Sequence, residues 1–162
     1  MASTKTRDQQ KGLSLIEIIV TIFVCSVALI MVLNLLTFSI KAAAVSKADL
    51  IAANLAQEGI ELIRYNREIS DWVVWHSSVV NGDYRVQYNS SSLLAYSETP
   101  LKIDGDGFYQ YDAGTNTPFY RKITLAKVSD DELQVLVEIK WRDVNNVWRY
   151  LKVEDRLWNW RK

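Results

Sequence analysis

Glu17 places an ionisable carboxylate inside an apolar segment of the sequence. It is the only acidic or basic residue between Leu13 and Ile40, a stretch that also lacks Gly and Pro. A carboxylate near the centre of a membrane helix costs about 3 kcal/mol or more, so it is usually present for a function and has a partner. The chemistry to expect at Glu17 is therefore pairing with a positive charge.

The segment around Glu17 is long enough to span a bilayer. About 20 apolar residues cross the hydrocarbon core as a helix, and the stretch from Leu13 to Ile40 exceeds this length. Three basic residues, Lys5, Arg7 and Lys11, precede it, which favours a cytoplasmic amino terminus. A cleaved secretory signal is disfavoured, because its apolar core would end after about 7–15 residues.

The segment Lys11-Gly12-Leu13-Ser14-Leu15-Ile16-Glu17 resembles the class III leader of prepilins, the precursors of type IV pilins and pseudopilins. In that family a basic leader ends in Gly, a prepilin peptidase cuts after it, and the fifth residue of the mature chain is Glu. The resemblance implies cleavage after Gly12, N-methylation of the new terminus at Leu13, and a role of Glu17 in assembly. Leu13 replaces the family's usual Phe, although an apolar residue is kept.

Charge pairing between copies gives this acid a physical role. Cleavage would free an amine at Leu13, which is largely cationic at neutral pH. Glu17 lies four residues further on, roughly 6 Å along a helix. A neighbouring copy displaced along a shared axis would bring its amine beside this carboxylate, and the two charges would neutralise one another in a dry environment. The alternative is an ordinary signal anchor in which Glu17 reaches back to the headgroups.

The helical pattern continues beyond the membrane segment. Apolar residues recur at spacings of four and three, and they are Ala48, Ala52, Leu55, Gly59 and Leu62, with Ile51 and Ile63 beside them. Gly59 costs the helix about 1 kcal/mol relative to Ala, so we expect a sheet to approach closely there. The segment from Leu55 to Arg64 is also similar to one that recurs in minor pilins.

The last third of the chain predicts an antiparallel meander. Strands are expected at Phe119–Val128, Glu132–Arg142 and Val147–Val153, and an earlier strand at Tyr84–Tyr88 should follow a turn at Asn81-Gly82-Asp83. Apolar and polar residues alternate along the middle strand, so one face is buried. Packing the helical stripe on that face predicts an α+β fold, a long N-terminal helix packed on a C-terminal antiparallel β-sheet, as the resemblance also implies.

Four regions follow from these patterns. They are a leader at 1–12, a transmembrane and filament-core helix at 13–40, an amphipathic helix at 41–70 and a globular β-rich head at 71–162.

Other candidate sites have simpler interpretations. The run Asp104-Gly105-Asp106-Gly107, with Asp112 beyond it, could bind calcium, but Asp-Gly pairs are common in hairpin turns and a turn is favoured. His76 is the only histidine and lacks catalytic companions, so we expect a packing role and no enzyme. Cys25 is the only cysteine, which leaves no intrachain disulfide. No cofactor, metal or small-molecule substrate is expected.

The carboxy-terminal tail interleaves aromatic and basic residues, which are Trp158, Trp160, Arg161 and Lys162. Base stacking on tryptophan with phosphate contacts from basic residues is typical of unspecific single-strand binders, so a weak DNA contact is one alternative. The chain balances 19 Lys and Arg against 19 Asp and Glu, which does not point to nucleic acid. A tail that closes the sheet edge, with one of the tryptophans packed on the core, is favoured.

The resemblance implies a structural subunit of a type IV pilus-like filament. The major pilins of the family often carry a Pro in the second half of the membrane helix, whereas no Pro occurs here before Pro100, so a minor pilin is favoured. Its partners would be other pilin or pseudopilin subunits, the prepilin peptidase and the assembly platform. The precursor would cross the cytoplasmic membrane once with its head outside and later join a pilus at the cell surface. A pseudopilin of a type II secretion or DNA-uptake machine, and an uncleaved single-pass membrane protein with a ligand-binding head, remain alternatives.

Overall fold

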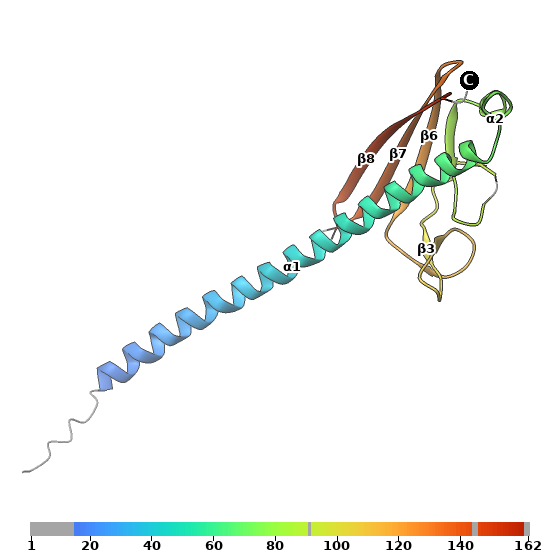
Figure 1. Ribbon diagram of the computed structural model, residues 1–162. Coiled ribbons are helices and arrows are strands. Elements are labelled where there is room, and N and C mark those ends of the chain that lie inside the picture. Colours follow the sequence, from blue (N-terminus) through green and yellow to red (C-terminus); the bar gives the residue numbers. More distant parts are fainter. Residues whose placement is uncertain (1–14, 91, 144–145, 161–162) are drawn as a thin grey trace, which may run out of the picture. The chain divides into compact units, whose positions relative to one another are not determined.

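The computed structural model describes residues 15–90, 92–143 and 146–160 (Figure 1). Its contacts form two compact units, which meet in the sequence between Ala42 and Ala43. The helix α1 (Leu15–Glu68) contributes to both units. The second unit also contains α2 (Trp72–Ser78) and the strands β1 (Gly82–Arg85), β2 (Leu94–Ala95), β3 (Lys102–Ile103), β4 (Tyr109–Gln110), β5 (Thr115–Asn116), β6 (Tyr120–Ser129), β7 (Glu132–Arg142) and β8 (Trp148–Trp158).

In the first unit, α1 is an exposed apolar helix. Among the described residues, α1 is the one helix long and apolar enough to cross a membrane, and none of that stretch is buried. Three hydroxyl groups in it, on Thr21, Ser26 and Thr37, donate hydrogen bonds of 2.7 to 2.9 Å to backbone carbonyls four residues earlier. These bonds satisfy the hydroxyl groups within the helix itself, which suits apolar surroundings.

The second unit contains two antiparallel sheets. The larger has the order β2-β1-β6-β7-β8, and the smaller has the order β4-β3-β5. Val137 at the middle of β7 pairs with Ile123 of β6 and with Val153 of β8. The predicted meander is confirmed: β7 has its predicted bounds, and β8 continues to Trp158, past the predicted end at Val153.

The sequence interpretation of the segment before the meander was partly wrong. Gly82 and Asp83, assigned to a turn, are the first residues of β1 and pair with Leu125 and Thr124 of β6. The side chain of Asn81 accepts a 2.8 Å hydrogen bond from the N–H of Lys127, which holds the start of β1 against the meander. Pairing with a neighbouring strand therefore overrides the local turn preference of this segment.

The second half of α1 covers the inner face of the larger sheet, and the predicted α+β fold is confirmed. The buried residues of α1 are Ala52, Leu55, Ala56, Gly59, Ile60, Ile63 and Arg67. They pack with fully buried residues of the meander, which include Ile123, Leu125, Leu133, Val135, Val137 and Ile139. Ala48 and Leu62, which belong to the predicted stripe, are only partly buried, so the centre of the stripe runs through Ala56 and Ile63.

The close approach predicted at Gly59 is confirmed. A Cβ atom at this position would lie 3.1 Å from Cγ1 of Val137 and 3.3 Å from Cδ of Arg121. Both distances are shorter than ordinary van der Waals contact, so any larger side chain would push α1 away from β6 and β7.

Arg121 is a buried cation between α1 and the sheet. It occupies an inward position of β6 and is 1% exposed. Its Nη2 donates a 2.7 Å hydrogen bond to the carbonyl of Val86, and its Nη1 donates a 3.3 Å bond to the carbonyl of Leu55. Nη1 also lies 3.1 Å from Oε1 of Glu58. One guanidinium thus joins β6, α1 and the segment after β1.

Replacing Gly59 by Leu should lower the free energy of unfolding by about 1–3 kcal/mol, because the added atoms overpack the contact with Val137. The matched control is Ala53→Leu on the exposed face of the same helix, for which a change within about 0.5 kcal/mol is expected. Denaturant unfolding of the full chain in detergent, followed by circular dichroism, measures both. Equal stability of the two variants would contradict the packing argument.

Replacing Arg121 by Met should cost about 1–3 kcal/mol of unfolding free energy, because the buried carbonyl of Val86 loses its donor. Arg149→Met serves as the control, since the side chain of Arg149 is exposed and contacts the carboxylate of Asp143 instead of a buried backbone carbonyl. The same unfolding experiment compares them. A loss at position 121 no greater than at position 149 would show that the buried contacts do not stabilise the head.

Candidate functional site

The carboxylate singled out by the sequence lies at the exposed end of the apolar helix. Glu17 is in the first turn of α1, where an acid interacts favourably with the helix dipole, and its side chain is exposed. The hydroxyl of Thr21 donates a 2.7 Å hydrogen bond to the backbone carbonyl of Glu17, not to its carboxylate. Gly12 and Leu13, the residues of the predicted cleavage site, lie outside the described residues.

The helix around Glu17 exposes a large apolar surface. Its exposed large apolar residues are Leu15, Ile16, Ile18, Ile19, Val20, Ile22, Phe23, Val24, Val27, Leu29, Ile30, Met31, Val32, Leu33, Leu35, Leu36, Phe38 and Ile40. A surface of this kind needs lipid or other apolar helices around it, because exposing it to water is costly. These apolar side chains surround the helix on all sides, so the apolar surface is not confined to one face.

His76 has a packing environment. It is 9% exposed, and its ring stacks on that of Trp72 with the centroids 5.1 Å apart. The ring of Trp72 also packs against that of Trp75, with a centroid distance of 5.8 Å. The histidine therefore belongs to an aromatic cluster that closes one end of the core.

The Asp104 run forms the predicted turn, between β3 and β4. The carboxylate of Asp104 accepts hydrogen bonds from the N–H groups of Asp106 and Phe108, at 3.0 and 2.9 Å, and from Nε2 of Gln110 at 3.2 Å. Asp112 instead accepts a 2.6 Å bond from Gln87. Both oxygens of Asp104 thus serve the turn. In the part of the chain that the structure describes, no group of three His, Cys, Asp or Glu residues could hold a metal.

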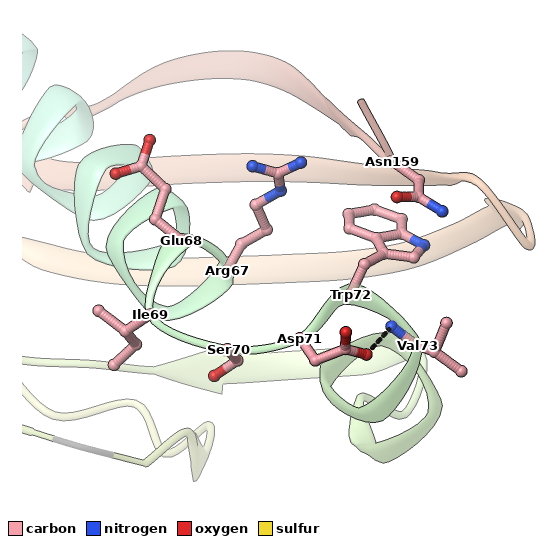
Figure 2. Close-up of a pocket in the computed structure, with 8 residues that line it drawn as sticks. All are labelled: Arg67, Glu68, Ile69, Ser70, Asp71, Trp72, Val73 and Asn159. Carbon is pink, nitrogen blue, oxygen red and sulfur yellow. Dashed lines mark hydrogen bonds between the residues drawn. The ribbon is translucent and has the colours of Figure 1, made fainter. Parts of the chain in front are cut away.

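A pocket of about 330 Å³ lies where α1 ends, lined by Arg67, Glu68, Ile69, Ser70, Asp71, Trp72, Val73 and Asn159 (Figure 2). Arg67 is its central feature. The guanidinium lies 5.5 Å from the ring centroid of Trp72 and 4.8 Å from that of Trp160. Its Nη2 donates a 2.7 Å hydrogen bond to the carbonyl of Trp158. Arg67 therefore fastens the carboxy-terminal segment to the end of α1.

The tryptophans of the tail remain accessible, with Trp158 52% and Trp160 62% exposed. Arg161 and Lys162 lie outside the described residues. The other arginines near the tail bind carboxylates: Arg64 contacts Asp155 at 3.1 Å, and Arg156 contacts Glu132 at 2.8 Å. These ion pairs compete with phosphate binding, and the contact with DNA stays a prediction.

Arg67 and Arg121 were not predicted from the sequence, although one sequence signal points to both. Arg67 continues the buried spacing of Ile60 and Ile63 by four residues, and Arg121 takes the inward phase of Ile123 and Leu125. A basic residue at a position where the pattern expects a buried apolar one predicts a buried ion pair or a hydrogen bond to a buried carbonyl.

Replacing Arg67 by Ala should loosen the tail and lower the free energy of unfolding by about 1–3 kcal/mol, because the carbonyl of Trp158 and two cation–π contacts lose the guanidinium. Acrylamide quenching of tryptophan fluorescence should increase. The control is Arg64→Ala on the previous turn, whose contacts are at the surface. Unchanged quenching in the Arg67 variant would show that the tail is held by other contacts.

The matches of this chain to known proteins are confined to its first part. Residues 7–33 match the family model of the prokaryotic N-terminal methylation motif. The matched region includes Gly12, Leu13 and Glu17. No curated protein and no solved structure matches the chain.

Proposed function

The chain carries the N-terminal methylation motif of type IV pilins and pseudopilins, and on this basis we propose that it is a structural subunit of a type IV pilus-like filament. The family is one of structural subunits and not of enzymes. The observation that carries the proposal is the exposed apolar half of α1, with one carboxylate in its first turn. Such a helix is suited to lipid before assembly and to neighbouring helices afterwards.

Processing creates the second charge of the assembly contact. In this proposal the prepilin peptidase cleaves after Gly12, and the amine of Leu13, N-methylated or not, becomes the cation that Glu17 of a neighbouring copy binds. The pair forms only at one axial displacement of the two helices, so it selects register. Removing either charge leaves the other unpaired in an apolar environment, at a cost of about 3–5 kcal/mol.

The subunit is more consistent with a minor pilin than with a major one. The helix α1 continues from Leu15 to Glu68 without Pro, and Asn34 leaves an amide within its apolar half. Its partners in this proposal are other pilin or pseudopilin subunits, the prepilin peptidase and the assembly platform of the cytoplasmic membrane. The head faces outward before assembly and reaches the cell surface with the filament.

Replacing Glu17 by Ala should leave cleavage largely intact and reduce incorporation into filaments by about tenfold or more, since the new amine loses its partner. Quantifying the subunit in sheared filaments and in membranes, by immunoblot, measures both steps. The control is Asp49→Ala, which removes an acid further along the same helix. Normal incorporation of the Glu17 variant would contradict the charge-pairing mechanism.

The mature protein from its native membrane should begin at Leu13. The intact mass and the amino-terminal peptide, measured by mass spectrometry, test this directly and also report N-methylation. A chain that keeps Met1–Gly12 in a host with an active prepilin peptidase would be a signal anchor, and Glu17 would then need a different partner.

A further inference from the structure

The strand β8 forms an open edge of the head. It is the outermost strand of the larger sheet on the side away from β2, and it pairs with β7 along its whole length (Figure 1). An edge strand presents a row of backbone N–H and C=O groups that can pair with another strand. Strands in globular proteins usually have about 3–10 residues, whereas β8 has 11.

Two hydrogen bonds show which residues of β8 face this open edge. The N–H of Asp143 donates to the carbonyl of Val147 at 3.0 Å, and the N–H of Asn159 donates to the carbonyl of Asp131 at 3.0 Å. Both bonds continue the β7–β8 ladder, in which hydrogen-bonded and non-hydrogen-bonded pairs alternate. The odd-numbered residues of β8 therefore bond to β7, and the even-numbered residues direct their backbone groups outward. The carbonyl of Trp158, which Arg67 binds, obeys this rule.

The side chains of the even-numbered residues on the two sides of Val153 are complementary to one another. In chain order they are Trp148, Tyr150, Lys152, Glu154, Arg156 and Trp158. An antiparallel copy with Val153 opposite Val153 would place each lysine opposite a glutamate, each tyrosine opposite an arginine and each Trp148 opposite a Trp158. These are favourable cross-strand combinations of charge and of aromatic rings.

We propose that β8 pairs antiparallel with β8 of a second copy of this chain, with Val153 on the two-fold axis. In this register Lys152 with Glu154 and Tyr150 with Arg156 form the hydrogen-bonded pairs, as their outward backbone groups require, while the outward carbonyl of Trp158 keeps its hydrogen bond from Arg67. Lys152 of each copy faces Glu154 of the other across the axis. The two larger sheets become one continuous sheet, and α1 of each copy lies on the same side of it.

Neighbouring registers are disfavoured by charge. Moving the copy by one hydrogen-bonded step in either direction sets Lys152 against Lys152, or Glu154 against Glu154. Like charges directly opposite one another are destabilising in an antiparallel pair. The outer face holds these groups in place, because Lys152 contacts Glu138 on β7 at 2.7 Å and Arg156 contacts Glu132 at 2.8 Å. The charges at the edge therefore extend an existing ladder of ion pairs.

The inner face of β8 adds an apolar contribution. A groove of about 420 Å³ runs between α1 and β8, and its lining residues are Ala53, Gln57, Ile60, Glu61, Arg64, Leu151 and Val153. Pairing across Val153 would join the groove of one copy to that of the other and cover the half-buried side chains of Val153 and Leu151. Asp155 would face Leu151 of the second copy, while its carboxylate stays bound to Arg64 at 3.1 Å.

The symmetry of the contact sets the relative direction of the two heads. Within the head, α1 and β8 run in the same direction, because Arg64 contacts Asp155 and the next turn of α1, at Arg67, contacts Trp158. A two-fold axis at Val153 therefore makes the parts of α1 that cover the two sheets run in opposite directions.

Disulfide trapping tests this register in the full chain. The full-length Cys25→Ser protein with Val153→Cys is placed under mild oxidation in detergent. The two Cα atoms should lie about 4.5 Å apart, which suits a disulfide, so a covalent dimer is expected at least about tenfold faster than with Ser97→Cys at an exposed site elsewhere on the head. Equal rates for positions 153 and 97 would overturn the proposal.

Mixed variants test the register further. Leu151→Cys and Asp155→Cys should each dimerise poorly alone and react with each other when mixed, because residues 151 and 155 lie opposite one another in this register. Efficient reaction of either variant with itself would contradict the assigned register.

Charge reversal tests the specificity of the contact. In the Val153→Cys background, Lys152→Glu and Glu154→Lys should each slow trapping by about tenfold, because two attractive pairs become repulsive. Mixing the two variants should restore it, since every glutamate then meets a lysine. Equal trapping of all four samples would show that another feature of β8 makes the contact. Glu17→Ala should leave trapping unchanged, which separates this contact from filament assembly, and thermal unfolding verifies that each variant is folded.

Discussion

The head depends on the burial of one charged group, the guanidinium of Arg121. It lies at the close approach of α1 to the sheet, with its Cδ 3.3 Å from the position that a Cβ of Gly59 would take. The carbonyls of Leu55 and Val86 accept hydrogen bonds from the guanidinium. The hydroxyl of Tyr111 donates a 3.2 Å hydrogen bond to the backbone carbonyl of Arg121. Burial raises the pKa of Tyr111, so this donor keeps its proton at neutral pH. These contacts hold α1, β6 and the segment after β1 together, although Nε of Arg121 is buried without a hydrogen-bond partner among the described residues.

Glu17 poses the same physical problem with a different solution. Arg121 finds its acceptors within its own chain, whereas Glu17 is exposed on a helix whose apolar surroundings disfavour an unpaired charge. The partner of Glu17 must therefore come from outside the described residues. In the proposed assembly a second molecule supplies this partner, which would make assembly selective, because a misplaced neighbour leaves the charge unpaired. The buried arginine would thus stabilise one head, and the carboxylate would favour one arrangement of several copies.

How much of the structure can be predicted from the sequence depends on how far apart in the sequence the interacting residues lie. The exposed apolar half of α1, β7 and the close approach at Gly59 follow from periodicity and composition, which are local properties. The two buried arginines and the start of β1 at Gly82 depend on contacts with residues distant in sequence, such as Arg67 with Trp158 and Gly82 with Leu125. Local preferences alone assigned Gly82 to a turn, because they contain no information on the partner strand. The predicted cleavage at Gly12 rests on the family motif and lies outside the described residues.

Two surfaces of this chain are incomplete in the single copy. The apolar half of α1 needs lipid or other apolar helices around it, because its side chains are exposed. The edge of β8 needs a strand of opposite direction, and its charge pattern about Val153 matches β8 of a copy that faces it. Neither contact uses residues of the other, because α1 supplies the first from residues before Ala43 and β8 supplies the second. The two contacts can therefore form independently of one another.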